Sequence, residues 1–275
     1  MSCNVAENMV NFQKEHYSYE DMLEIMRVLR APGGCPWDAE QTHASIRRNF
    51  LEETCEAVEA IDNGDMSALC EELGDVLMQV VFHAQMEAEA GGFTMQDVID
   101  GLCRKLVYRH PHVFSDVKVK NSAEVLTNWE ALKRREKAQR SASDAIDAVA
   151  KTLPALWRAE KMEEKAARAG FVWPEGSDGA LRKLEEETRE LRAAVEAGNA
   201  EGRHGVREEV GDVLFMAAQV AQSHGVDPEA ALHAACDKFA RRFRGVEKGA
   251  GGTPLSALSQ EELLALWSAA KQTES

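Results

Sequence analysis

The stretch that decides the fold is LEETCEAVEAI at residues 51–61, followed by EELGDVL at residues 71–77, because the chain contains the same pair a second time. The second copy is EEETRELRAAV at residues 185–195, followed by EEVGDVL at residues 208–214. Each copy has the form EExxE, then a gap long enough for a helical hairpin, then ExxD. Residues three or four positions apart lie on one side of an α-helix. The repeat therefore predicts two helical hairpins that each gather carboxylates.

Helical periodicity extends over most of the chain, whereas runs of Val, Ile and Thr that would suggest strands are nearly absent. Helix-forming residues such as Ala, Leu, Glu, Arg and Lys dominate the composition. The pattern predicts an all-α fold. The expected helices cover residues 19–29, 39–61, 66–90, 95–109, 123–140, 156–169, 179–197, 206–223, 228–246 and 260–271.

Two large copies of one plan predict tandem domains rather than a solenoid, which is built from more numerous and smaller repeats. A short polar segment from Ser141 to Asp144 separates the copies and contains residues that favour the start of a helix. We place the domain boundary there. The N-terminal domain then comprises residues 1–142, and the C-terminal domain comprises residues 143–275.

The charge balance excludes several classes of protein. The 275 residues include 47 acidic and 32 basic ones, which gives a formal net charge of −15. A general binder of nucleic acid or of anionic membranes presents a basic face, so we expect neither as a partner. No apolar run is long enough to span a bilayer, and the first residues do not resemble a signal peptide. The six cysteines form no CxxC pair, which is typical of reduced thiols in a cytoplasmic protein.

Helical geometry predicts that four acids of each copy lie at the edge of an apolar stripe. In the first copy, the stripe residues are Ala57, Val58 and Ile61 on one helix and Leu73, Val76, Leu77 and Val80 on the next. Antiparallel packing of the two helices would bring the acids together. These acids are Glu53, Glu56, Glu72 and Asp75 in the first copy and Glu187, Glu190, Glu209 and Asp212 in the second.

Carboxylates that converge in this way repel one another unless a cation lies between them. Oxygen ligands alone are typical of Mg²⁺, for which Mn²⁺ can substitute, and such ions commonly accompany a phosphate substrate. No His or Cys falls into the acidic cluster at a spacing typical of zinc sites. The alternative is a solvated acidic helix face, which is the usual interpretation of a single EExxE. The duplication favours the metal site.

Basic residues accompany both acidic pairs. They are Lys105 and Arg109 after the first pair, Lys183 one turn before Glu187, and Lys238, Arg241 and Arg242 after the second pair. On a helix beside the acids, such cations could bind the outer phosphates of a metal-bound polyphosphate. The alternative is a solvated face with ion pairs along the helix. Trp267, in the last expected helix, either stacks on a base or packs in the core.

Further motifs accompany the acidic pairs. They are GCPWDAEQTH at residues 34–43, VVFHAQ at 80–85, RHPHVF at 109–114, KAARAGFVWP at 165–174 and KFARRF at 238–243. Together these motifs resemble the MazG family of nucleoside triphosphate pyrophosphohydrolases in its two-domain form, over nearly the whole chain. The resemblance implies tandem all-α MazG domains of the four-helix-bundle type, a homodimer, and Mg²⁺-dependent hydrolysis of nucleoside triphosphates to the monophosphate and pyrophosphate.

The resemblance also implies that the C-terminal domain is catalytic and that the N-terminal domain is regulatory or weakly active. The implied metal ligands are Glu187, Glu190, Glu209 and Asp212. The implied nucleotide contacts are Lys183, Glu186, Lys238, Arg241, Arg242 and Trp267. The corresponding second site in the N-terminal domain would comprise Glu53, Glu56, Glu72, Asp75, Lys105 and Arg109.

The chain departs from the family pattern at a few positions. Gln219 and Gln222 replace the Asn and Arg of an NLAR-like segment, Cys236 replaces an Asn before KF, and Val172 replaces the Asp of GFDW. The metal acids are intact, so these changes bear on base recognition and rate more than on the class of reaction.

The expected reaction is metal-assisted hydrolysis over a broad range of NTPs and dNTPs, serving removal of aberrant nucleotides or regulation of the nucleotide pool. Glu186 or Glu208, outside direct ligation, would accept the proton of the attacking water. The basic helix would neutralise the leaving pyrophosphate. The sequence leaves attack at the α or the β phosphorus open. The alternative is a helical module that senses a nucleotide or binds a partner without turnover.

Overall fold

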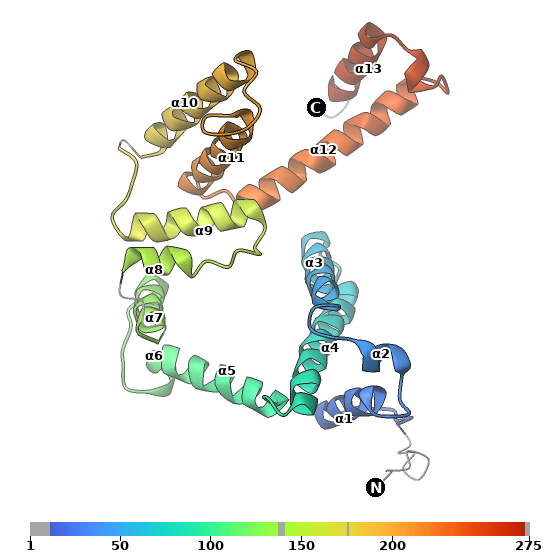
Figure 1. Ribbon diagram of the computed structural model, residues 1–275, viewed down its shortest axis with the longest axis vertical. Helices are drawn as coiled ribbons and strands as arrows, with labels where there is room; N and C mark the ends of the chain where they lie inside the picture. The colour runs from blue at the N-terminus through green and yellow to red at the C-terminus, as the bar shows by residue number, and fades with distance from the viewer. Residues whose placement is uncertain (1–11, 137–140, 175, 273–275) are drawn as a thin grey trace. The chain divides into compact units, whose positions relative to one another are not determined.

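The computed structural model describes residues 12–136, 141–174 and 176–272. Within these ranges every regular element is helical and no strand is present, which confirms the predicted all-α fold (Figure 1). The chain divides into two compact units, Met1–Leu132 and Lys133–Ser275. The division falls inside α7 (Ser122–Glu136), ahead of the boundary proposed after residue 142. Residues 137–140, where we expected α7 to continue, lie outside the described ranges.

The first unit consists of helices joined by short turns. They are α1 (Tyr19–Arg30), α2 (Pro36–Glu40), α3 (Arg47–Asn63), α4 (Met66–Ala90), α5 (Met95–Arg109), α6 (Pro111–Phe114) and most of α7. Asp65 begins α4, because its carboxylate accepts hydrogen bonds from two backbone N–H groups of the first turn. Gly91 ends α4 in the left-handed conformation, with a φ of 76°. Capping at both ends explains why the prediction of a helix over residues 66–90 is confirmed.

The prediction of one continuous helix over residues 39–61 is wrong, since α2 ends at Glu40 and α3 begins at Arg47. In between, the backbone N–H of Thr42 donates to Oγ of Ser45, and the N–H of Ser45 donates to Oγ1 of Thr42. Side chains that bond to nearby backbone groups in this way compete with helix formation.

The core of the first unit lies where α1 packs against α4. Met26 on α1 is buried against Val81, Phe82 and Met86 on α4, and Ile46 joins them from the segment before α3. These apolar contacts fix the part of α4 that follows its acidic residues Glu71 and Glu72.

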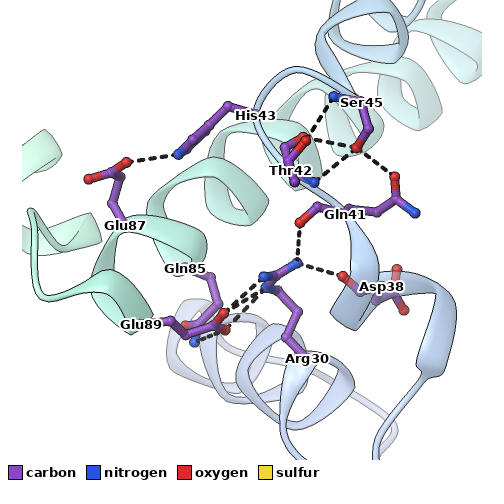
Figure 2. Close-up of polar contacts among 9 residues, drawn as sticks. All are labelled: Arg30, Asp38, Gln41, Thr42, His43, Ser45, Gln85, Glu87 and Glu89. Atoms are coloured by element: carbon purple, nitrogen blue, oxygen red, sulfur yellow. Dashed lines mark hydrogen bonds and ion pairs between the residues drawn. The ribbon is translucent and has the colours of Figure 1, made fainter.

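Arg30, at the end of α1, connects the segments around this core (Figure 2). Its guanidinium pairs with the Glu89 carboxylate on α4 at 2.9 Å and donates a hydrogen bond to the backbone carbonyl of Asp38. Nearby, a ring nitrogen of His43 lies 2.8 Å from a carboxylate oxygen of Glu87 (Figure 2). The segment between α1 and α3 is therefore fixed to α4 by polar contacts at two points.

The second unit repeats the hairpin plan. Its helices are α8 (Ala142–Asp147), α9 (Ala155–Arg168), α10 (Ser177–Glu196), α11 (Val206–Ser223), α12 (Pro228–Gly249) and α13 (Gln260–Gln272), with a short 3₁₀ turn at Leu255–Ala257. The short α8 was not expected, although Ser141 and Asp144 form the capping box that begins it. Helix α9 packs against α11 in the way that α1 packs against α4.

The apolar stripe of each hairpin is only partly buried within its own unit. Ala57 is buried as predicted, but Leu73 and Leu77 on α4 and Ile61 on α3 are exposed. In the second unit, Leu214 on α11 is 50% exposed. The prediction that the two stripes bury each other is therefore wrong in part, because two helices cover only the inner half of the stripe.

No helix in the described part of the chain is both long enough and apolar enough to cross a bilayer.

Candidate metal centre

The helices α10 and α11 bring together three of the four predicted acids of the second copy. Carboxylate oxygens of Glu187 on α10 and of Glu209 and Asp212 on α11 all lie within 4.8 Å of one another. Glu209 and Asp212 share a helix side because they are three residues apart. The hairpin places Glu187 opposite them. Three oxygens at this separation can surround a divalent cation.

Two of these acids are buried, which is uncommon for Glu. Glu209 is only 2% exposed and Glu187 only 7%. The Oε2 atom of Glu209 is buried and has no hydrogen-bond partner. A buried, unpartnered carboxylate oxygen is unfavourable in the protein alone. This residue set therefore fits a hard divalent cation, which would pair with that oxygen.

Lys183 supplies positive charge within α10 itself. Its Nζ lies 2.8 Å from an oxygen of Glu187 and 3.0 Å from one of Glu186. These two carboxylates raise the pKa of Lys183 well above its usual range. Lys183 therefore remains a cation beside the acids and partly offsets their repulsion.

Asp212 shows the repulsion that remains. Burial, followed by the nearby charges of Glu187 and Glu208, raises the pKa of the Asp212 carboxyl. Positive charge is thus still deficient around Asp212, despite Lys183.

The fourth acid, Glu190, belongs to a different group. Ligand atoms of Glu190, His204 and Glu209 lie within 4.8 Å of one another, so Glu209 is common to both groups. A hollow of about 380 Å³ opens at this place, and its wall includes Ala193 and Ala194 of α10. A histidine thus lies beside the acids in space, although none falls into the acidic motifs at a spacing typical of zinc sites. The sequence spacing did not reveal this contact, because His204 lies in the loop between α10 and α11 and the conformation of that loop places it beside the acids.

The two predicted proton acceptors have polar contacts of their own. An oxygen of Glu208 accepts a hydrogen bond of 2.6 Å from the backbone N–H of His204. Glu186 pairs with Lys183, as described above. Neither residue belongs to the two groups of ligand atoms.

The remaining predicted nucleotide contacts lie on other helices than the acids, since Lys238, Arg241 and Arg242 are on α12 and Trp267 is on α13. Lys238 is exposed and, in the described part of the chain, forms no ion pair with the acids of α10 and α11. Arg241 is exposed and Arg242 is half-buried. Trp267 is half-buried and lies against the exposed Phe239, with ring centroids 5.2 Å apart.

Of the departures from the family pattern, the structure gives Gln219 a specific contact. Its side-chain oxygen accepts a hydrogen bond from the indole N–H of Trp173. Gln219 therefore connects α11 to the segment before α10. Gln222 is half-buried and Cys236 and Val172 are exposed, with no contact that assigns them a role.

The first acidic hairpin is similar but more open. Carboxylate oxygens of Glu53, Glu72 and Asp75 lie within 4.8 Å of one another, whereas Glu56 is exposed and outside the group. Burial and the neighbouring carboxylates raise the pKa of both Glu53 and Glu72. The three grouped acids are half-buried rather than buried.

The predicted cations of the first hairpin lie on α5. The guanidinium of Arg109 lies over the ring of Trp129 on α7, 5.2 Å from its centroid, and Arg109 is buried there. Lys105 is half-buried on the same helix. Arg109 therefore has a packing role within the first unit.

Comparison with known proteins agrees with this geometry. The profile of the MazG nucleotide pyrophosphohydrolase domain matches residues 41–114 and 176–246 of the chain. The first segment contains α3, α4 and α5, and the second contains α10, α11 and most of α12. The fold and the paired acidic hairpins are thus those of MazG domains in tandem. The chain belongs to the MazG nucleotide pyrophosphohydrolase family.

Individual relatives match over most of the chain. A nucleoside triphosphate pyrophosphohydrolase of Escherichia coli K12 is 41% identical over 259 residues, covering 92% of this chain and 97% of the relative. The nucleoside triphosphate pyrophosphohydrolase/pyrophosphatase MazG of Thermotoga maritima is 40% identical over 255 residues, covering 92% and 95%. The uncharacterised protein YabN of Bacillus subtilis is 45% identical over 261 residues, covering 94% of this chain but only 53% of YabN. The chain thus spans about half of YabN.

Proposed function

We propose that this chain hydrolyses nucleoside triphosphates to the monophosphate and pyrophosphate at the acids of α10 and α11, with Mg²⁺ as cofactor and Mn²⁺ as a substitute. The observation that carries the proposal is Glu209, which is 2% exposed, has an unpartnered oxygen and is common to both groups of ligand atoms. The names of the Escherichia coli and Thermotoga maritima relatives support the same activity.

The residues of the centre divide the chemistry among themselves. Glu187, Glu190, Glu209 and Asp212 would hold the metal, through the two groups of ligand atoms that share Glu209. When bound there, the metal would supply a positive charge that polarises the phosphate and lowers the pKa of a water. Glu186 or Glu208 would accept the proton of the attacking water, because each directly precedes a ligand in the sequence without belonging to the ligand groups. Lys183 is placed to offset negative charge on the phosphates.

The cations of α12 complete the nucleotide site in this proposal. Lys238, Arg241 and Arg242 bind the leaving pyrophosphate, and Trp267 contacts the base. Lys238 is exposed and forms no ion pair with the acids in the described residues, so its binding of pyrophosphate would need movement of α12 or contact with a second chain. A broad range of NTPs and dNTPs is accepted, and the activity serves removal of aberrant nucleotides or regulation of the pool in the cytoplasm.

We also propose a homodimer, supported by the exposed apolar faces of both hairpins. Leu73 and Leu77 on α4 and Val210 and Leu214 on α11 are one helical turn apart within each pair and remain exposed. Leu214→Asp should convert a dimer into monomers in analytical ultracentrifugation. Val172→Asp, which alters an exposed apolar residue outside the hairpins, is the matched control. A wild-type monomer at micromolar concentration would contradict the dimer.

For the N-terminal domain, residues 1–142, we propose a regulatory or weakly active role. Its acids are grouped but half-buried, and its expected cation Arg109 packs on Trp129. Binding of a nucleotide without turnover is the alternative function that this open hairpin supports.

The direct test is product analysis with purified, untagged chain. Each NTP and dNTP is incubated with Mg²⁺, with Mn²⁺ or with EDTA, and pyrophosphate and nucleotide products are quantified. The proposal expects metal-dependent formation of monophosphate and pyrophosphate. Absence of turnover with every nucleotide and both metals, or release of inorganic phosphate with the diphosphate, would contradict it.

A further inference from the structure

The loop between α10 and α11 contains a residue with unusual backbone geometry. His204 has a φ of 60°. In the described part of the chain, no other residue except glycine has a positive φ. Residues with a side chain adopt this conformation at a free-energy cost, and such strain concentrates at functional sites. Two hydrogen bonds hold the strained backbone. Its N–H donates to Glu208, and its carbonyl accepts from the side-chain amide of Asn199.

This geometry directs the imidazole of His204 toward Glu209. Nδ1 of His204 lies 3.3 Å from Oε1 of Glu209, and a ligand atom of Glu190 completes a group within 4.8 Å. The His204 side chain is 69% exposed, so the group is open to solvent on one side. An ion can therefore enter directly from solution.

Two further observations indicate a ligand at this place. The Oε2 atom of Glu209, a residue only 2% exposed, is buried without a hydrogen-bond partner, and Glu209 is the residue that both groups of ligand atoms share. The hollow of about 380 Å³ adjoins Glu190, His204 and Glu209, and alanines of α10 leave it unfilled. The hollow provides room for the waters that would complete the coordination of an ion.

We propose that Glu190, His204 and Glu209 form a second divalent-cation site that selects Mn²⁺ or a similar transition-metal ion over Mg²⁺. The nitrogen ligand gives this selectivity, because imidazole suits transition ions whereas Mg²⁺ prefers oxygen ligands alone. Glu209 bridges this site and the all-oxygen site of Glu187, Glu209 and Asp212. The inference rests on the proposed function only in requiring that Glu209 binds a metal.

The test measures the ligand nitrogen directly and does not depend on turnover. Untagged full-length protein is titrated with Mn²⁺, bound ions are counted by electron paramagnetic resonance, and pulsed measurements detect ¹⁴N bound to the Mn²⁺. The variants are His204→Gln and, as matched control, His224→Gln, which changes an exposed histidine at the end of α11. Circular dichroism checks that both variants fold, and the wild-type ¹⁴N signal is informative whatever the variants do.

The expected result is ¹⁴N coupling in the wild type and in His224→Gln. In His204→Gln the coupling should disappear, and affinity for one Mn²⁺ should fall at least about tenfold while Mg²⁺ affinity changes little. Mn²⁺ that binds without ¹⁴N coupling, or coupling that persists in His204→Gln, would overturn the inference and leave the proposed function standing. Failure of the wild type to bind Mn²⁺ or Mg²⁺ would overturn both.

Discussion

The two acidic hairpins have the same motif but differ in how far their acids are buried. In α10 and α11, Glu209 and Glu187 are 2% and 7% exposed, whereas in α3 and α4 the corresponding Glu72 and Glu53 are only half-buried. Charge repulsion is stronger where water is excluded. The second hairpin therefore has the greater need of a cation, although the motifs give both hairpins the same four acids.

The residues around the second hairpin also distinguish it from the first. Lys183 pairs with the acids of the second hairpin, and the residue one turn before Glu53 is the neutral Asn49. His204 adds a nitrogen to the second hairpin only. The motif therefore places acids on one side of a helix, while burial and neighbouring residues decide what those acids can bind.

The largest thermal effect should come from metal binding to the second hairpin. At a metal concentration about 100 times Kd, binding stabilises a folded protein by about 2.7 kcal/mol. For a unit of this size, Tm should rise by about 5–10 °C. Calorimetry should show this rise in the wild type and in Glu72→Gln but not in Glu209→Gln.

Without metal, both variants should have a higher Tm than the wild type, because each substitution removes repulsion between carboxylates. The increase in Tm should be larger for Glu209→Gln. An equal metal response in all three proteins would break the distinction between the hairpins.

A second difference lies on the helices that support the hairpins. Helix α1 buries Met26, whereas α9 buries Glu163, whose two oxygens have no partner. Burial raises the pKa of Glu163 to about 8. The neutral form is therefore favoured in the folded protein, and the carboxyl should destabilise it increasingly as pH rises from about 4.5 toward 8.

Glu163→Gln should accordingly match the wild type near pH 4.5 and exceed its Tm by a few degrees at pH 8 and above, corresponding to about 1–3 kcal/mol. Melting curves recorded without metal at several pH values measure this. Glu164→Gln, which alters a partly exposed carboxylate paired with Arg168, is the control and should not show the trend. A gap between Glu163→Gln and the wild type that is independent of pH would contradict a buried, neutral Glu163.

The smallest stability effect should come from Lys183. Its pair with Glu187 is partly exposed, so Lys183→Gln should lower stability by about 1 kcal/mol or less. The same change should raise KM for the nucleotide severalfold, because a cation beside the phosphates is lost. Steady-state kinetics with Arg182→Gln, a change at an adjacent exposed position, provide the comparison. An unchanged KM would exclude Lys183 from phosphate binding.

Local features of the sequence predicted the helices well. The ends of α4 and α11 follow the hydrophobic period and, for α4, the capping by Asp65 and Gly91. The interruption before α3 was missed because it depends on mutual hydrogen bonds between Thr42 and Ser45, which the helical period does not reveal.

The candidate site was predictable only in part, for a similar reason. Spacing along one helix brings Glu209 beside Asp212, and pairing of the two helices adds Glu187. The contribution of His204 depends on the backbone conformation of a loop, and the exposure of Leu214 depends on what covers α11. Neither property is encoded in a periodic pattern of residue types.

We assign the chemistry to the second hairpin. The most direct measurement is metal-dependent pyrophosphate release by Glu209→Gln and Glu72→Gln, assayed side by side with the wild type at saturating metal. Glu209→Gln should lose at least about 100-fold in kcat/KM, as expected for loss of a group that holds the catalytic ion, and Glu72→Gln should retain most of its activity. Loss of turnover in Glu72→Gln with activity retained in Glu209→Gln would contradict the account and move the active site to the first hairpin.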